Sequence, residues 1–539
     1  MTRFRQAGPA LLLATLLLAG GCLRRESAVQ SGNRDGILHR GMGYEVGSLD
    51  PQLAANIGEM DVASALFEGL VDEDPADLHP VPGVAARWEI SPDRLTYTFY
   101  LRPEAKWSDG SPVTAADFVG SWRRILTPSL GAGNASLLFL LEGAEAYHRG
   151  LAADFSQVGA TALDAHTLRV RLEHPAPYFL NLLAHPAWMP VSLRAITAAG
   201  AAADRGNPWA RPGSLVGDGP FALKTWEPNR RIVVEKSPAY WDAARVRLQA
   251  IDFYPIESRD TEERSFRAGQ LHITYALPFG KADSYRRSHP ELLREDPYLD
   301  TYFFRLNVRR APFGDARVRR ALAQGIDRAA IVSRILRGGQ RAATALTPPG
   351  LPGYTPPAGF AVDVAAARQL LADAGYPGGR GLPPIELLYN NSENLRLVAE
   401  AVQEMWRRDL GVDVHLASQE FKVVLSERRA GNYQMVLSDW VGDYPDPATF
   451  LEVWRGDSGS NQTGWSSAAY DGLLFAAART ADPAERAGLL RKAETLLLEA
   501  APVIPLYYNT HVFLLQPSVR GWLPNLLDHH PYKQVWLED

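Results

Sequence analysis

The sequence contains a single cysteine, Cys22, among its 539 residues. The body of the protein therefore has no disulfide, no cysteine-ligated zinc or iron–sulfur cluster and no thiol nucleophile. Long apolar runs are missing as well, because the run at residues 9–18 is shorter than the roughly 20 residues of a membrane-spanning helix and no later stretch is long enough. Basic and acidic residues number 56 and 61 without a basic block, which argues against charge-driven binding of nucleic acid.

Catalytic motifs are also absent. There is no His-Glu-x-x-His pair and no phosphate-binding loop, and residues 456–460 (GDSGS) miss the nucleophile-elbow pattern at the last position. His529 and His530 are a weak metal candidate, since an adjacent pair is more often solvated or packed. Asp443 and Asp446 could be the carboxylate pair of a glycosidase, but the sequence spacing does not fix the distance between them in the fold. These absences favour a binding protein without cofactor or metal over an enzyme.

Hydrophobic periodicity predicts a mixed α/β protein. With 46% hydrophobic residues, the chain is globular, and its length suggests three or four domains or lobes. Alternating apolar residues at 95–101 and 168–172 predict half-buried strands. Residues 482–497 begin with Asp, Pro and Glu in capping positions and then place leucines on one helical face. A second helical face at 397–406 is followed by alternating residues at 412–416, which predicts a helix leading into a strand.

The first 22 residues have the pattern of a bacterial export signal. Arg3 and Arg5 precede the apolar run, and small residues 19–21 lead directly to Cys22. This order is similar to a lipobox, in which the cysteine is lipidated. We expect a lipoprotein signal peptide at 1–21 and a tether at 22–35. The protein would then be exported and lipid-anchored at the periplasmic or extracytoplasmic face of a bacterial membrane. An ordinary cleavage site beside an unmodified cysteine is the competing interpretation.

Several sequence blocks occur in a fixed order along the chain. They are residues 86–88 (ARW), 105–118 (AKWSDGSPVTAADF), 217–221 (GDGPF), 240–242 (YWD), 312–319 (PFGDARVR), 326–328 (IDR), 439–447 (DWVGDYPDP) and 502–508 (PVIPLYY). In this order they resemble the extracellular solute-binding proteins of the peptide/nickel ABC-transporter type. Within that family, the likeness is closest to the oligopeptide-binding proteins, and it extends from about Gly43 to Trp536.

The resemblance implies a three-lobed, periplasmic-binding-protein-like fold of the class with an extra lobe. Two mixed α/β lobes would be joined by a two-strand hinge, with crossings at 297–304 and 504–511. Lobe I would be discontinuous in sequence, and its three segments would be residues 36–70, 194–298 and 509–539. The extra lobe II would comprise residues 71–193, and lobe III would comprise residues 299–508.

It also implies a receptor that captures oligopeptides by their backbone and termini and delivers them to the permease subunits of an ABC importer. Such a receptor is a monomer, meets the membrane through its lipid anchor and binds no nucleic acid. Within the family, a dipeptide, a murein peptide or an oligosaccharide stays open as the ligand. Nickel is disfavoured because no soft ligand or tight histidine cluster is present. An exported hydrolase is the alternative from another class.

By resemblance, Asp443 is the anchor for the peptide α-amino group, because an enclosed ammonium needs a carboxylate. The implied backbone and pocket residues are Asn56, Ile57, Phe421, Trp440, Val441 and Gly442. Asp443 competes with an interpretation as a turn residue, and Trp440 with one as a core residue.

The site for the peptide carboxylate departs from the family pattern. Leu437 and Leu395 occupy positions where relatives place a cation or a histidine. The remaining candidate carboxylate anchors are Arg305, Arg334, Arg337 and Arg428. For each of them, an ordinary surface arginine is the competing interpretation.

Overall fold

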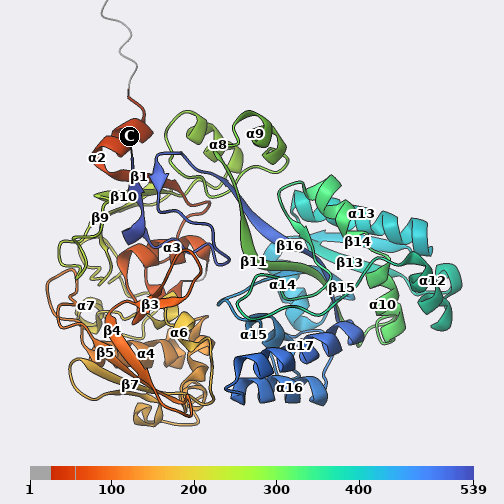
Figure 1. Ribbon diagram of the computed structural model, residues 1–539, viewed down its shortest axis with the longest axis horizontal. Coiled ribbons are helices and arrows are strands. Elements are labelled where there is room, and N and C mark those ends of the chain that lie inside the picture. The colour runs from red at the N-terminus through yellow and green to blue at the C-terminus, as the bar shows by residue number, and fades with distance from the viewer. Residues whose placement is uncertain (1–25, 55, 539) are drawn as a thin grey trace, which may run out of the picture.

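The computed structural model describes residues 26–54 and 56–538, and Cys22 with its signal segment lies outside them. The described chain is a mixed α/β protein (Figure 1), and its three largest groups of buried hydrophobic residues lie in three different bodies. We keep the names lobe I, lobe II and lobe III for the bodies around these cores. None of the described helices has the length and apolar character to span a bilayer.

Lobe I is assembled from three stretches of chain, because one core cluster joins residues from 38–67, 189–273 and 513–535. Its central sheet has the strand order β1-β10-β9-β8. The strands are β1 (Ile37–Gly41), β8 (Phe221–Glu227), β9 (Arg231–Lys236) and β10 (Ala250–Tyr254), with the small pair β17 (Val519–Arg520) and β18 (Trp536–Leu537). The helices are α2 (Ala28–Asp35), α3 (Ile57–Leu66), α7 (Leu193–Ala199), α8 (Arg259–Arg267) and α9 (Ala282–Ser288).

Lobe II contains an antiparallel sheet of order β4-β5-β7-β6. In β5, alternate residues Tyr97, Phe99 and Leu101 are buried, which confirms the period-two prediction. The strands are β2 (Val71–Glu73), β3 (Pro80–Pro82), β4 (Ala85–Ile90), β5 (Thr96–Leu101), β6 (Ala160–Ala162) and β7 (Thr167–Arg171). The helices are α4 (Ala115–Leu126), α5 (Ala144–His148) and α6 (Phe179–Leu182).

Lobe III is a six-stranded mixed sheet of order β12-β16-β11-β15-β13-β14, with a separate apolar cluster on each face. Besides the long strands β11 (Leu293–Leu306) and β16 (Val503–Leu514), its strands are β12 (Arg341–Ala342), β13 (Ile385–Asn390), β14 (Val414–Gln419) and β15 (Met435–Val441). Its helices are α10 (Ala316–Gln324), α11 (Arg328–Ala330), α12 (Val364–Asp373), α13 (Glu393–Leu410), α14 (Phe421–Ala430), α15 (Ala448–Leu451), α16 (Ala468–Arg479) and α17 (Pro483–Ala500).

The helix predicted from residue 482 is α17. Its N-cap Asp482 accepts a hydrogen bond from the Glu485 amide at 2.7 Å, and Pro483 occupies the first turn. Such a cap satisfies an amide that has no partner within the helix. The predicted helix and strand pair from residue 397 is also confirmed, as α13 followed by β14.

Two long antiparallel strands, β11 (Leu293–Leu306) and β16 (Val503–Leu514), contain the segments predicted as hinge crossings. One end of the pair, Leu293 with Leu514, packs beside lobe I, and the other end, Phe304 with Ile504, lies in the core of lobe III. Figure 1 shows both strands running between the two sides of the molecule. Two paired strands bend together while their backbone hydrogen bonds stay satisfied.

The tether predicted at 22–35 is wrong over residues 28–35, which form helix α2. Ser27 and Gln30 make a capping box, and Gly36 ends the helix in the left-handed conformation. The Val29 amide donates to the carbonyl of Gly269 in lobe I. The polar composition of this stretch therefore reflects a surface helix docked on lobe I.

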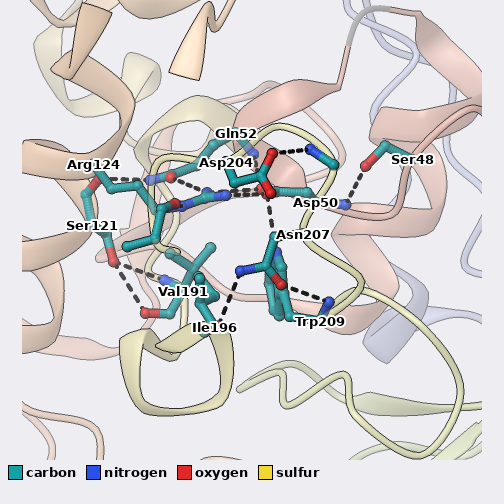
Figure 2. Close-up of polar contacts among 12 residues, drawn as sticks. Ser48, Asp50, Gln52, Ser121, Arg124, Val191, Ile196, Asp204, Asn207 and Trp209 are labelled. Atoms are coloured by element: carbon teal, nitrogen blue, oxygen red, sulfur yellow. Dashed lines mark hydrogen bonds and ion pairs between the residues drawn. The ribbon is translucent and has the colours of Figure 1, made fainter. Parts of the chain in front are cut away.

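A buried ion pair ties lobe II to the segment of lobe I that leads into the cleft. Arg124 of α4 contacts Asp50 at 2.7 Å, and each side chain is 2% exposed. The Arg124 guanidinium also donates to Gln52, and the Trp209 indole donates to Asp50 at 3.1 Å (Figure 2). Because buried charges are stable only when they are paired and hydrogen-bonded, this network fixes the chain just before Asn56 and Ile57.

Candidate functional site

Two cavities meet at Asp443. The smaller, of about 270 Å³, is bounded by lobe I residues such as Asn56 and Ile57 and by Val441 to Asp443 of lobe III. The larger, of about 1250 Å³, lies between lobe II and lobe III and also includes Trp440. Asp443 is therefore at the junction of all three lobes.

The carboxylate of Asp443 makes no hydrogen bond or ion pair with any described residue, although its amide donates to the Thr449 hydroxyl at 3.1 Å. Asp446, three residues later, is different, because both of its oxygens accept from Arg486 at 2.7 and 2.8 Å. The Asp443 side chain contacts solvent in the cleft while protein crowds it from several directions. This crowding raises the pKa of Asp443 to about 6. A carboxylate of this kind gains from a cation supplied by a ligand.

The strand before Asp443 has an open edge. β15 pairs with β11 over its whole length, but on its other side β13 contacts only Met435 and Val436. Among the described strands, none pairs with Leu437–Val441 on that side. Unpaired amides and carbonyls at a strand edge are a template for an extended peptide.

Gly442 joins this edge to Asp443. Its amide donates to the Leu299 carbonyl at 2.7 Å. A Cβ at this position would lie 2.5 Å from the Leu299 Cδ2 atom, so a glycine is required for the close approach to β11. The predicted trio Val441, Gly442 and Asp443 is thus brought together at the cleft.

Asn56 and Ile57 lie across the smaller cavity from that trio. Asn56 is the N-cap of α3, and its Oδ1 atom accepts from the Glu59 amide at 3.0 Å. Its side-chain oxygen is therefore occupied by the helix, while its main chain lies at the smaller cavity.

The two predicted aromatic residues are placed differently. Trp440 is half-buried against the lobe III core, borders the larger cavity, and has an indole Nε1 without a hydrogen-bond partner. Phe421, the first residue of α14, is 51% exposed and borders neither of these two cavities. The structure thus brings Trp440 to Asp443 and leaves Phe421 apart.

Arg305 is not suited to bind a ligand carboxylate. It is 1% exposed, donates to the carbonyls of Ser460 and Asn461, and lies 4.6 Å from the centre of the Trp454 ring. Burial lowers its pKa to about 9. These contacts show a structural residue of lobe III, so this candidate assignment is corrected.

The other candidate arginines have different surroundings. Arg334 is exposed on a π-helical turn, Ile331–Leu336, and Arg337 forms an ion pair with Asp283. Arg428 is half-buried, and its Nε atom has no partner. Neither cavity at Asp443 includes Arg428, so its role as a carboxylate anchor stays a prediction.

The leucines that replace expected polar positions are packed inside lobe III. Leu437 is 3% exposed and Leu395 is 8% exposed, both within one apolar cluster. Neither position therefore offers a polar group to the cleft.

The adjacent histidines take part in protein contacts. His529 lies 2.8 Å from Glu73, and His530 lies 2.8 Å from Asp528 and stacks on Trp522 at 3.9 Å. The packing interpretation is thus confirmed for His530. Elsewhere among the described residues, Asp74, Asp77 and His79 bring three ligand-type atoms within 4.8 Å of one another, on a turn outside the cleft.

Sequence reasoning missed several groups at the cleft. Glu452 borders the larger cavity, accepts from the Tyr178 hydroxyl at 3.5 Å, and has its pKa raised to about 7 by burial. Tyr178 of lobe II stacks on Tyr444 of lobe III at 4.2 Å. Tyr444 follows Asp443 directly in the sequence, which could have indicated that it lies at the cleft. No sequence pattern links Tyr444 to Tyr178.

Arg259 of α8 is an exposed cation on the lobe I side. Its charge acts on the hydroxyls of Tyr44 and Tyr302, opposing the rise in pKa that burial causes there. No sequence motif identifies Arg259, because its approach to Tyr302 depends on how lobe I is positioned relative to β11 in the folded protein.

Comparison with known proteins gives a consistent result. The family model described as "Bacterial extracellular solute-binding proteins, family 5 Middle" matches residues 79–462. The periplasmic oligopeptide-binding protein OppA of Escherichia coli K12 is 37% identical over 494 residues, which span 90% of this chain and 89% of that protein. The periplasmic murein peptide-binding protein MppA of the same organism is 37% identical over 486 residues, 89% of this chain and 88% of that one.

Solved structures agree. The murein tripeptide-binding protein MppA of Escherichia coli superposes with a TM-score of 0.81 at 35% identity, covering 93% of this chain and 98% of that one. Haemophilus influenzae OppA in complex with the peptide RPPGFSPFR superposes with a TM-score of 0.80 at 30% identity, covering 94% and 99%.

Proposed function

Since this chain belongs to the bacterial extracellular solute-binding proteins of family 5, we propose that it captures oligopeptides for an ABC importer and holds their α-ammonium group at Asp443. The observation that supports this most is the unpartnered Asp443 carboxylate at the junction of the three lobes. Relatives that are named for binding oligopeptides and murein peptides agree with this class of ligand.

The backbone of the peptide would add to the open edge of β15. Alternate residues of an added strand direct their amides and carbonyls toward those of the Leu437–Val441 edge, and such bonds are independent of side-chain identity. The main chain at Asn56 and Ile57 faces the same ligand from lobe I. Affinity thus comes from groups that every peptide has.

Ligand side chains would enter the two cavities. The larger one combines charged residues with apolar ones such as Leu137 and Phe475, and a cavity of this size holds water along with a side chain. Bending of β11 and β16 would close the lobes over the peptide. Closure excludes water from the ammonium and its carboxylate and strengthens their attraction.

No bond of the peptide changes in this scheme, and the protein acts as a receptor that passes its cargo to permease subunits. Lipidation of Cys22 would hold it at the membrane beside them. A monomer is sufficient, because Asp443, the strand edge and the lobe I segment belong to one chain.

The test is to incubate the purified protein with a defined mixture of free-amine peptides and to analyse bound and unbound fractions by mass spectrometry. We expect intact peptides to be recovered in a one-to-one complex. Recovery of fragments would show a hydrolase instead. Equal binding of free and N-acetylated peptides would contradict the role of Asp443.

A further inference from the structure

A second pair of carboxylates lies beside the proposed peptide strand. Asp300 is on β11 and Asp439 is on β15. In the antiparallel ladder, Asp300 is opposite Val441 and Tyr302 is opposite Asp439. The two aspartates are therefore diagonal neighbours on one face of the sheet, close enough for their side chains to interact.

Asp300 is only 2% exposed. Its Oδ2 atom accepts from Asn509 at 2.9 Å, and its Oδ1 atom has no hydrogen-bond partner. Leaving a buried carboxylate oxygen without a partner is costly in a folded protein. Asp439 is exposed, so the pair extends from the protein interior to the surface beside the open edge of β15.

Electrostatics agree with this picture. The pKa of Asp300 is raised well above its usual value by burial and then by the charge of Asp439. Protein packed around the exposed Asp439 side chain also raises its pKa by displacing water, and the charges of Arg428 and Arg305 oppose that rise. Among the ion pairs of the described residues, none includes either aspartate.

The neighbouring cations are placed elsewhere. Arg305 is five residues after Asp300 on β11, so its side chain projects from the opposite face of the sheet. There it donates hydrogen bonds to backbone carbonyls. Arg428 belongs to α14, which packs on that opposite face through Val424 and Val436. Arg259 acts on Tyr302 from lobe I and stays exposed.

The face that holds the two aspartates also has an apolar surface. Tyr302 and Tyr507 stack on each other at 4.7 Å, beside Asp439 and Asn509. The methylene stem of a lysine or arginine packs well on such rings while its charged end reaches a carboxylate.

The position along the strand sets which ligand residue would reach the pair. Asp439 is two residues before Val441, the last paired residue of β15, which corresponds to roughly 7 Å at about 3.3 Å per residue. A peptide whose first residue lies opposite Val441, with its ammonium toward Asp443, would bring its third residue opposite Asp439 and its fourth residue one step further along the edge.

We propose that Asp300 and Asp439 form a second cation subsite, which selects peptides with lysine or arginine at the third or fourth residue. This inference rests on the proposed peptide binding at Asp443. The same pair would repel the terminal carboxylate of a tripeptide, so the preferred ligands are longer peptides with a basic residue at that place.

The experiment uses free-amine hexapeptides that differ by lysine or norleucine at a single position from two to five. Isothermal titration calorimetry would measure each pair. We expect lysine at position three or four to improve the dissociation constant at least about tenfold over norleucine, and lysine at the other positions to change it less than about threefold.

Variants then assign the effect. Asp439→Asn and the double variant with Asp300→Asn should reduce the lysine preference to less than about threefold and leave the norleucine peptides close to wild-type affinity. Glu400→Gln, which removes a surface carboxylate of lobe III (side chain 45% exposed), is the matched control and should keep the preference. Asp439 is exposed, so its single variant tests the idea even if the double variant fails to fold.

A lysine preference at none of these positions, or one that survives in the Asp439→Asn protein, would overturn the subsite. Failure of the proposed function gives a different result: norleucine hexapeptides would then bind equally well with free and acetylated amines, or no hexapeptide would bind.

Discussion

Replacement of Asp443 by asparagine removes the negative charge and keeps the size of the side chain. In the wild type, no described residue competes for this carboxylate, so the ammonium of the ligand would be its only ion-pair partner. Loss of one member of an enclosed charge pair costs about 2–5 kcal/mol. Because solvent reaches Asp443 through the cleft, we expect the lower end of this range, about 2–3 kcal/mol, or about 30- to 150-fold in dissociation constant.

The assay is a double-mutant cycle by isothermal titration calorimetry, with wild type and Asp443→Asn against one peptide in free and N-acetylated forms. Acetylation of the peptide should weaken binding to the wild type by about the same 30- to 150-fold, and binding to the variant by less than about threefold. The reason is that acetylation and the Asp443→Asn substitution remove the same interaction. Asp457→Asn is the matched control, because Asp457 borders the larger cavity with a 70% exposed side chain. Wild-type affinity in the Asp443→Asn protein, or an acetylation cost that persists in it, would refute the reasoning.

Three further outcomes follow from the same contacts. The pKa of Asp443 is raised to about 6, so its carboxylate is charged above that pH and neutral below it. Peptide affinity measured by calorimetry should therefore fall about tenfold per pH unit below 6. The affinity of the Asp443→Asn protein should not change with pH over the same range. Gly442→Ala, which places a Cβ 2.5 Å from Leu299, should lower the free energy of unfolding in urea by about 1–3 kcal/mol and weaken peptide binding; unchanged values for both would contradict the tight approach. Arg486→Leu leaves the Asp446 carboxylate buried without its cation and should cost about 3–5 kcal/mol of stability in the same assay, while a wild-type midpoint would contradict a structural role for this pair.

Local patterns in the sequence were sufficient for many elements of the fold. The cap at Asp482 and the apolar spacing after it define α17, and the alternation at 95–101 defines β5, because both depend on neighbours within a few residues. The failure at residues 28–35 has the same origin. A short polar helix docked on lobe I depends on contacts such as the one with Gly269, which the local sequence does not show.

Site residues that belong to a sequence motif were predicted, whereas residues brought together only by the register of strand pairing were missed. Asp443 lies within the block at 439–447, and its free carboxylate agrees with the role expected from the resemblance. Asp300 and Asp439 become neighbours only through the pairing of β11 with β15. Arg305 remained a candidate carboxylate anchor because the sequence does not show that its guanidinium donates to the carbonyls of residues 460 and 461.

The central claim is that Asp443 receives the amino group of an intact peptide in the cleft. A crystal structure of the protein with a bound free-amine hexapeptide tests it most directly. The account predicts the peptide nitrogen at ion-pair distance from the Asp443 carboxylate and the peptide backbone paired with Leu437–Val441. A peptide bound with its amino group elsewhere, and with Asp443 facing only solvent, would contradict it.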